Sequence, residues 1–572
     1  MESEKKEFEI LNGTLIKYNG ENEEVIVPEN IFNIAETAFI GNNLITKITL
    51  SNSIEVIENN AFKNCKKLKE IKFKEGLCVI GGYAFMGCEN LRKLDFPDTL
   101  RSIGKRAFSG CKNLQEINFG KYLKTIGEYT FMNCNNLKNI QFPKYLISIE
   151  KYAFNECNNL TKIIFSRFVE YIGVHAFSDC KNIQEIEFPN DLICVDDYAF
   201  HNCRNIKELE FGDNLDFIGS YAFSKCTNLK KIYFSKDLTI ISNNAFEDCS
   251  KIHKLEFHNE LINIGDAAFK ECTLLNEIIL PDSLEEIGDQ AFKNCINLKK
   301  ISFGNNLKII RDYAFINCSK LSNLVFPESL EEIGDYAFYG CRNILSAKFS
   351  RFLEFIGECA FMGCSKLTTI NLPYLLDSIG KEAFRNCTNL SSVKFSDILT
   401  TISEGLFMGC HGLISITLPK KLDAIEHKAF KNCTNISNII FPEELRLIDS
   451  QAFSACESLT HIKLPDSLET LDEEAFSECK NLKKIRLSNR LIELPYGCFR
   501  NCISLETIEL PEKLRCINGF SGCINLKKVI CHDNIKLIEN FAFKNCINLE
   551  DINIPSSALT DTYAFLGCEK LQ

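Results

Sequence analysis

A chain of 572 residues would ordinarily divide into roughly three or four domains, so internal repetition has to be examined before domains are counted. Its 45% hydrophobic and 25% charged residues exclude an intrinsically disordered chain. The net charge of −11 argues against a nucleic-acid partner, because binding to a phosphate backbone needs clustered Lys and Arg.

The N-terminal residues predict a capping hairpin at 1–24. Asn12-Gly13 lies between alternating apolar residues, which is a strong signal for a β-hairpin. The charged start is not followed by the apolar core of a secretory signal, and no stretch approaches the about 20 apolar residues of a membrane-spanning helix. We therefore expect a cytoplasmic protein without membrane insertion, with non-classical export to the cell surface as the alternative.

Residues 25–572 carry a 23-residue repeat. Phe recurs at every 23rd position from Phe39 to Phe499, and three further copies follow at Phe520, Phe543 and Phe565. One turn is too small to bury its apolar side chains, but stacked turns bury them in a continuous core. The sequence therefore predicts a solenoid of about 24 turns, irregular from residue 500 onward and without an evident C-terminal cap.

Each turn is expected to contain a short strand, a bend and a helical turn. Alternation such as Ile71-Lys-Phe73 is typical of a strand with one buried face. Gly, Ser or Asp then precedes Ala-Phe, and these residues favour the start of a helical turn. Twelve of the thirteen prolines directly follow the strand, where a missing N–H ends the hydrogen-bond ladder.

The recurring pattern Leu-x-x-Ile-x-Phe-Pro-x-x-Leu-x-x-Ile-Gly-x-x-Ala-Phe-x-x-Cys resembles the BspA-type, or Treponema pallidum-type, leucine-rich repeat. The resemblance covers residues 25 to 571. It implies an α/β repeat solenoid, curved, with a parallel sheet on its concave face. The family includes many surface proteins of bacteria and parasitic protists, some of them adhesins.

Cysteine is the most conspicuous candidate for chemistry. Of the 29 cysteines, 23 form one column, three residues after the repeating Phe, from Cys65 to Cys568. There is no C-x-x-C pair of the kind that zinc sites use, so no metal is expected. We interpret the column as small buried apolar residues in a reduced compartment, with disulfides between adjacent turns as the alternative.

Catalysis is not expected. Between Phe39 and Phe499 there is no insertion on which a site could be built, and the eight His residues are scattered over different repeat positions. No phosphate-binding glycine loop is present, so the sequence predicts neither catalytic residues nor a cofactor.

The outward residues of the concave strands are the remaining candidates for partner binding. Four glutamates on two neighbouring strands suggest a basic partner segment, since like charges side by side are unfavourable. On later strands, the corresponding outward residues include lysines and an arginine, which are positively charged. The simpler alternative is that an exposed sheet face has to be polar. The predicted partner-binding residues are Glu185, Glu187, Glu208, Glu210, Tyr233, Lys348, Lys394, Lys463 and Arg486.

The C-terminus stops before its next strand, at Leu571-Gln572. An open end exposes an unpaired edge, which predicts either a truncated chain or end-to-end self-association. Three functions remain: a non-enzymatic scaffold that binds a protein on its concave sheet, a cell-surface or secreted adhesin, and a self-assembling structural protein.

Overall fold

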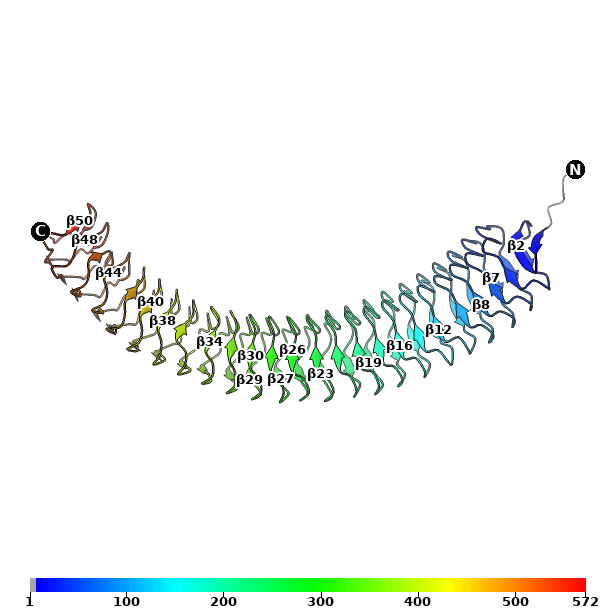
Figure 1. Cartoon of the computed structure of the whole chain (residues 1–572), viewed down its shortest axis with the longest axis horizontal. Coiled ribbons are helices and arrows are strands. Elements are labelled where there is room, and N and C mark those ends of the chain that lie inside the picture. The colour runs from blue at the N-terminus through cyan, green and yellow to red at the C-terminus, as the bar shows by residue number, and fades with distance from the viewer. Residues whose placement is uncertain (1–6, 572) are drawn as a thin grey trace. The chain divides into compact units, whose positions relative to one another are not determined.

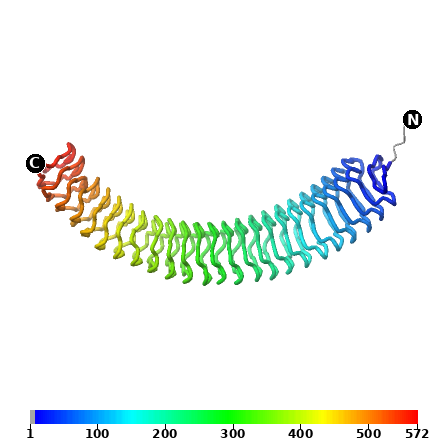
Figure 2. Tube along the Cα trace, viewed as in Figure 1, coloured from blue at the N-terminus to red at the C-terminus, as the bar shows by residue number. Residues whose placement is uncertain are grey.

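The computed structural model describes residues 7–571, which form two compact units that meet in the chain between Leu284 and Glu285. Both units are built from successive turns of chain (Figures 1 and 2). Each turn carries two short strands. One strand of each turn has three residues and the other has two, apart from the last turns and the N-terminal hairpin. The turns are therefore β-solenoid turns with two series of strands.

The first unit begins with the hairpin strands β1 (Phe8–Leu11) and β2 (Thr14–Tyr18). Its three-residue strands are β3 (Glu24–Ile26), β5 (Lys47–Thr49), β7 (Glu70–Lys72), β9 (Lys93–Asp95), β11 (Glu116–Asn118), β13 (Asn139–Gln141), β15 (Lys162–Ile164), β17 (Glu185–Glu187), β19 (Glu208–Glu210), β21 (Lys231–Tyr233), β23 (Lys254–Glu256) and β25 (Glu277–Ile279). Its two-residue strands are β4 (Asn33–Ile34), β6 (Val56–Ile57), β8 (Val79–Ile80), β10 (Ser102–Ile103), β12 (Thr125–Ile126), β14 (Ser148–Ile149), β16 (Tyr171–Ile172), β18 (Cys194–Val195), β20 (Phe217–Ile218), β22 (Ile240–Ile241) and β24 (Asn263–Ile264).

The second unit repeats this arrangement. Its first series comprises β27 (Lys300–Ser302), β29 (Asn323–Val325), β31 (Ser346–Lys348), β33 (Thr369–Asn371), β35 (Ser392–Lys394), β37 (Ser415–Thr417), β39 (Asn438–Ile440), β41 (His461–Lys463), β43 (Lys484–Arg486), β45 (Thr507–Glu509), β47 (Lys528–Ile530) and β49 (Asp551–Ile552). Its second series comprises β26 (Glu286–Ile287), β28 (Ile309–Ile310), β30 (Glu332–Ile333), β32 (Phe355–Ile356), β34 (Ser378–Ile379), β36 (Thr401–Ile402), β38 (Ala424–Ile425), β40 (Leu447–Ile448), β42 (Thr470–Leu471), β44 (Glu493–Leu494), β46 (Cys516–Ile517), β48 (Leu537–Ile538) and β50 (Leu559–Thr560).

Neighbouring turns pair in parallel and in register. Ile163 of β15 lies opposite Ile186 of β17, and Ile149 of β14 lies opposite Ile172 of β16, in each case 23 residues apart. The predicted parallel sheet is therefore confirmed. The second series of strands was not expected from the sequence.

The predicted helical turn is wrong, because residues 7–571 contain no helix. In the segment around Phe223 the backbone is left-handed at Tyr221 (φ 57°) and at Lys225 (φ 61°), and left-handed residues interrupt a right-handed helix. The N–H groups of these two residues and of Phe223 donate to carbonyls of the next turn, over 3.0, 2.8 and 2.8 Å. Bonds between turns thus replace the bonds that a helix would make within itself. It follows that the described part of the chain has no helix able to cross a lipid bilayer.

The N-terminal hairpin leads into the repeat. Strands β1 and β2 pair antiparallel, and both Asn12 (φ 50°) and Gly13 (φ 72°) have the positive φ that a tight hairpin turn needs. Strand β2 pairs with β4, and the ring of Tyr18 stacks on Phe39 at 5.4 Å. Residues 1–6 and Gln572 lie outside the described residues, and the division at 24/25 stays a prediction.

The core is a column of stacked phenylalanine rings, one per turn. Phe223, which is fully buried, lies 5.3 Å from Phe200 and 5.4 Å from Phe246, with the three rings almost parallel. A second row of rings packs edge-on against this column, as Phe188 does against Phe200 at 5.8 Å. The repeat therefore uses phenylalanine for ring packing between turns.

The cysteine column is buried beside the phenylalanines. The thiol of Cys180 donates to the carbonyl oxygen of Phe154 in the preceding turn, over 3.1 Å, and the same carbonyl accepts the N–H of Cys157. Equivalent thiol contacts recur along the column, for example from Cys65 and from Cys546. Burial raises the pKa of the Cys157 thiol to about 12, which keeps it protonated and unreactive.

We expect these thiols to be free and slow to react in the folded protein. All 29 cysteines should react with a thiol reagent in denaturant, since we expect them to be thiols and not disulfides. Under native conditions the buried column should react far more slowly than the partly exposed Cys78. A denatured count well below 29, restored by a reducing agent, would contradict this assignment.

Candidate interaction surfaces

The outward faces of the three-residue strands are the first candidate surface. In most of these strands the middle residue is buried and the two outer residues are exposed, as in Glu185-Ile186-Glu187. The predicted site residues all occupy such exposed outer positions: Glu185 and Glu187 on β17, Glu208 and Glu210 on β19, Tyr233 on β21, Lys348 on β31, Lys394 on β35, Lys463 on β41 and Arg486 on β43. Their role in binding stays a prediction.

The acidic cluster on β17 and β19 is partly neutralised by lysines on the flanking strands. Lys162 of β15 pairs with Glu187 at 2.7 Å and with Glu185 at 3.4 Å, which raises the pKa of Lys162. On the other side, Lys231 of β21 pairs with Glu208 at 3.6 Å. Four carboxylates and two ammonium groups leave a net charge of −2. The case for a basic partner is therefore weaker than the strand residues alone suggested.

The predicted positive row is not continuous. Lys348 and Lys394 lie on β31 and β35, which are separated by β33 with its neutral Thr369 and Asn371. Lys463 and Arg486, in contrast, lie side by side on paired strands. The structure thus brings together only the last two of the four predicted cations.

A lysine and a histidine complete a basic patch that was not expected from the sequence. His461 lies opposite Lys484 on the same pair of strands, so that His461, Lys463, Lys484 and Arg486 form a two-by-two array of exposed side chains, which we call the basic patch. Its one ion pair within residues 7–571 joins Arg486 to Asp466 at 3.2 Å. The sequence contains the signal for these two residues, because His461 and Lys484 lie two positions before Lys463 and Arg486 on the same strands. The residues at that position in the preceding turns are neutral.

Hollows adjoin the basic patch on both sides. One, of about 450 Å³, contains the exposed Ile440 together with Phe441 and Pro465. The other, of about 760 Å³, extends over β45 and β47 to Ile530. Lys484 and Arg486 line both hollows. The patch therefore combines positive charge with apolar surface, as protein-binding sites do.

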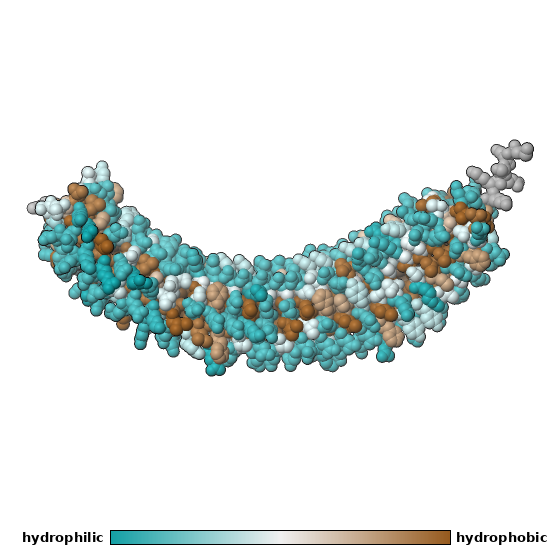
Figure 3. Space-filling view, viewed as in Figure 1, coloured by the Kyte–Doolittle hydropathy of each residue, from teal (hydrophilic) through white to brown (hydrophobic). Residues whose placement is uncertain are grey.

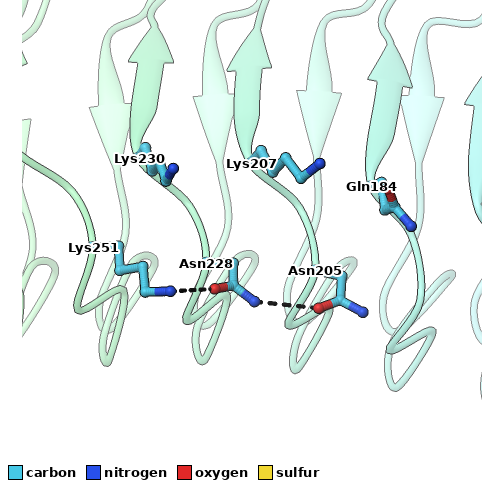
Figure 4. Close-up of a pocket in the computed structure, with 6 residues that line it drawn as sticks. All are labelled: Gln184, Asn205, Lys207, Asn228, Lys230 and Lys251. Atoms are coloured by element: carbon cyan, nitrogen blue, oxygen red, sulfur yellow. Dashed lines mark hydrogen bonds between the residues drawn. The ribbon is translucent and has the colours of Figure 1, made fainter.

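A third hollow, of about 320 Å³, lies at the edge of the first unit (Figure 4). Lys207, Lys230 and Gln184 lie beside the starts of the strands, and Asn205, Asn228 and Lys251 form a row on the adjoining bends. In this row Lys251 donates to Asn228 over 2.6 Å and Asn228 donates to Asn205 over 3.2 Å. The amides thus link successive turns to one another.

An aromatic ladder with a histidine follows the left-handed position of the repeat. The ring of His175 is sandwiched between Tyr152 and Tyr198, at 4.5 Å from each. Burial lowers the pKa of His175, and the nearby His201 lowers it further, while Asp179 and Asp197 oppose the shift. The folded protein therefore favours the neutral imidazole.

This histidine should make the stability depend on pH. Because its folded pKa is lowered, its contribution is present above the unfolded value of about 6.5 and is lost as the pH falls below it. His175→Tyr, which continues the tyrosine ladder, should reduce the drop in melting temperature between about pH 7.5 and pH 5. The exposed His253 supplies the control, since His253→Tyr should leave that drop unchanged. An unaltered drop in the His175 variant would contradict this assignment.

Metal binding has no visible site in this part of the chain: residues 7–571 bring no three His, Cys, Asp or Glu side chains together in a group that could hold an ion. On the face shown in Figure 3, separate apolar patches interrupt a mostly hydrophilic surface. The described surface thus offers charged and apolar patches for binding.

Comparison with known proteins gives one sequence-family match. The sequence model for the BspA type leucine rich repeat region matches six stretches, at residues 17–93, 78–206, 147–273, 239–368, 354–469 and 447–572. No curated protein matches the chain.

Solved structures of leucine-rich repeat proteins are similar to the chain. One from Bacteroides ovatus is 25% identical, with 77% of this chain and 83% of that chain covered and a TM-score of 0.33. The T. pallidum leucine-rich repeat protein is 23% identical, with 40% and 91% covered and a TM-score of 0.24. The pneumococcal vaccine antigen PcpA is 19% identical, with 76% and 86% covered and a TM-score of 0.25. Since these TM-scores are below 0.5, family membership rests on the sequence match alone.

Proposed function

Because the chain belongs to the BspA-type leucine-rich repeat family, we propose that it is a non-enzymatic scaffold that binds a protein on the outward face of its three-residue strands. The basic patch is the observation that carries this proposal. Like charges in register on paired strands are unfavourable by roughly 0.2–1 kcal/mol per pair. An acidic partner segment would relieve this repulsion.

The acidic cluster of the first unit is the weaker alternative surface. Its carboxylates are partly paired with Lys162 and Lys231, and exposed pairs of this kind are screened by solvent and contribute little to stability. A partner would have to replace these contacts. At the basic patch, Lys463 and Lys484 make no ion pair within the described residues, so a carboxylate that binds them displaces no such pair.

Charge reversal at the patch tests the proposal. The probe is a fluorescein-labelled peptide of glutamate and glycine, without apolar residues, and its dissociation constant is measured by anisotropy with the full chain. Lys484→Glu combined with Arg486→Glu should weaken binding by at least about tenfold, and added salt should weaken binding to the natural chain. The matched control is Glu187→Lys with Glu210→Lys, which should not weaken binding. Equal affinity of the natural and the Lys484/Arg486 variant chains would overturn the proposal.

A further inference from the structure

A row of exposed aromatic rings occupies one edge of the first unit. Tyr122, Tyr145 and Phe168, which we call the aromatic stripe, lie on three successive turns, in the connections from β11 to β12, from β13 to β14 and from β15 to β16. The ring centroids are 5.8 and 6.1 Å apart, and the side chains are 49%, 36% and 39% exposed. A groove of about 370 Å³ runs along them, lined also by the exposed Ile147.

The repeat itself does not require these rings. The same position holds Thr99 in the preceding turn and Asp191 and Asn214 in the following turns, and all of these turns keep the fold. Three consecutive large apolar side chains at a solvent-facing position therefore point to a contact with another molecule, since exposed apolar patches and tyrosines are concentrated at interfaces.

Positive charge surrounds the stripe. Arg101 lies over the ring of Tyr122 at 4.9 Å, Lys144 over Tyr145 at 5.2 Å and Arg167 over Phe168 at 5.8 Å. The fourth cation is Lys124, which lines the groove. None of these four side chains makes an ion pair within residues 7–571, and the groove contains one carboxylate, Glu170. A binding partner that complements these four cations would carry negative charge.

The ring geometry favours a peptide over a nucleic acid. Each ring of the stripe stacks on its neighbour, and a cation covers part of the remaining face of Tyr122, so the rings present mainly their edges. Bases bind by stacking on open aromatic faces, which this arrangement does not offer. Apolar side chains, in contrast, can pack into the grooves between ring edges.

We propose that the aromatic stripe binds a peptide segment whose apolar side chains pack against the three ring edges and whose flanking carboxylates pair with Arg101, Lys124, Lys144 and Arg167. This surface is separate from the basic patch, which lies in the other unit. The proposal for the aromatic stripe can therefore be tested independently of the proposal for the basic patch.

The probe for the test is a fluorescein-labelled peptide of alternating glutamate and leucine, with a lysine-for-glutamate counterpart. The variant combines Tyr122→Thr, Tyr145→Thr and Phe168→Asn, which are residues that other turns carry at this position and which should preserve the fold. The matched control is Phe352→Asn: Phe352 occupies the same repeat position, is exposed and lies under Arg351 at 5.0 Å, but has no stacked ring partner in the described chain.

The measurement uses a chain that carries Lys484→Glu with Arg486→Glu, so that the basic patch does not contribute to binding. We expect the glutamate–leucine peptide to bind this chain, and its anisotropy-derived dissociation constant to rise at least about tenfold when the triple change is added. Phe352→Asn in the same chain should change the dissociation constant by less than about twofold. The inference is overturned if the chain without the triple change does not bind the peptide, if the triple variant binds it unchanged, or if the lysine peptide binds as tightly. It is also overturned if the stripe variant instead loses binding to a single-stranded oligouridylate.

Discussion

Replacing Phe223 by Ala should lower the free energy of unfolding by about 3–5 kcal/mol. The side chain is fully buried, and its removal leaves a ring-sized cavity between Phe200 and Phe246, which cannot close without shifting two turns. Since each turn of a solenoid contacts only its neighbours, the loss weakens two interfaces between turns.

Urea unfolding of the full chain, followed by circular dichroism, measures this effect. Tyr233→Ala is the control in the same unit, because Tyr233 is 52% exposed, and it should change the stability by less than about 0.5 kcal/mol. A loss of under about 1 kcal/mol for Phe223→Ala would show that the column can repack around a gap.

Ala222→Leu should destabilise the chain by about 1–3 kcal/mol, because the small alanine that precedes most of the column phenylalanines allows adjacent turns to pack closely. The rings of Phe200 and Phe223 are 5.3 Å apart, and the N–H of Phe200 donates to the Ala222 carbonyl over 2.7 Å. A leucine at this buried position would force the turns apart.

Four turns carry another residue in place of this alanine, namely Thr130, Leu406, Cys498 and Gly519. With Leu406 and Cys498, the ring spacings from Phe384 to Phe407 and from Phe476 to Phe499 are both 5.9 Å. With Thr130 and Gly519, the spacings from Phe108 to Phe131 and from Phe499 to Phe520 are 5.5 and 5.6 Å, so the widest of the four accompany leucine and cysteine. The reverse change, Leu406→Ala, is the informative partner experiment. If the adjacent turns move together in this variant, its free energy of unfolding should fall by less than the about 2–5 kcal/mol that is typical of a buried Leu→Ala change. Unchanged urea midpoints for Ala222→Leu would refute this role of the alanine.

The parallel repeat and its register could be predicted from the sequence because the residues that recur in each turn are the buried ones. The positions of Phe223, of Ala222 and of the middle residue of each strand recur every 23 residues with similar apolar side chains, so their burial could be predicted from the sequence. The prediction of a helical turn at the bend was wrong because Gly, Ser and Asp, which also start helices, precede Ala-Phe there. Left-handed Tyr221 and Lys225 have no intrinsic preference for that conformation, and it is the hydrogen bonds to the next turn that impose it.

The candidate surfaces were predictable only in part. Outward placement of Lys463 and Arg486 followed from strand alternation, and extending the same argument by two residues would have added His461 and Lys484. The pairing of Lys162 with Glu187 depends on where long side chains come to lie, which alternation does not specify. The aromatic stripe was missed because it breaks the repeat at a variable position instead of following it.

The hydrogen bonds that Tyr221, Phe223 and Lys225 donate to the next turn also determine how the fold would respond to tension. Within each unit, a turn pulled from the end of a stack loses its main-chain partners in one neighbour only, while the rest of the stack keeps its contacts. Each such release frees 23 residues, or roughly 75–85 Å of extended chain. Stretching a single molecule should therefore give a series of small, nearly equal steps, so that the solenoid would lengthen gradually under load and would rewind turn by turn when the load is removed.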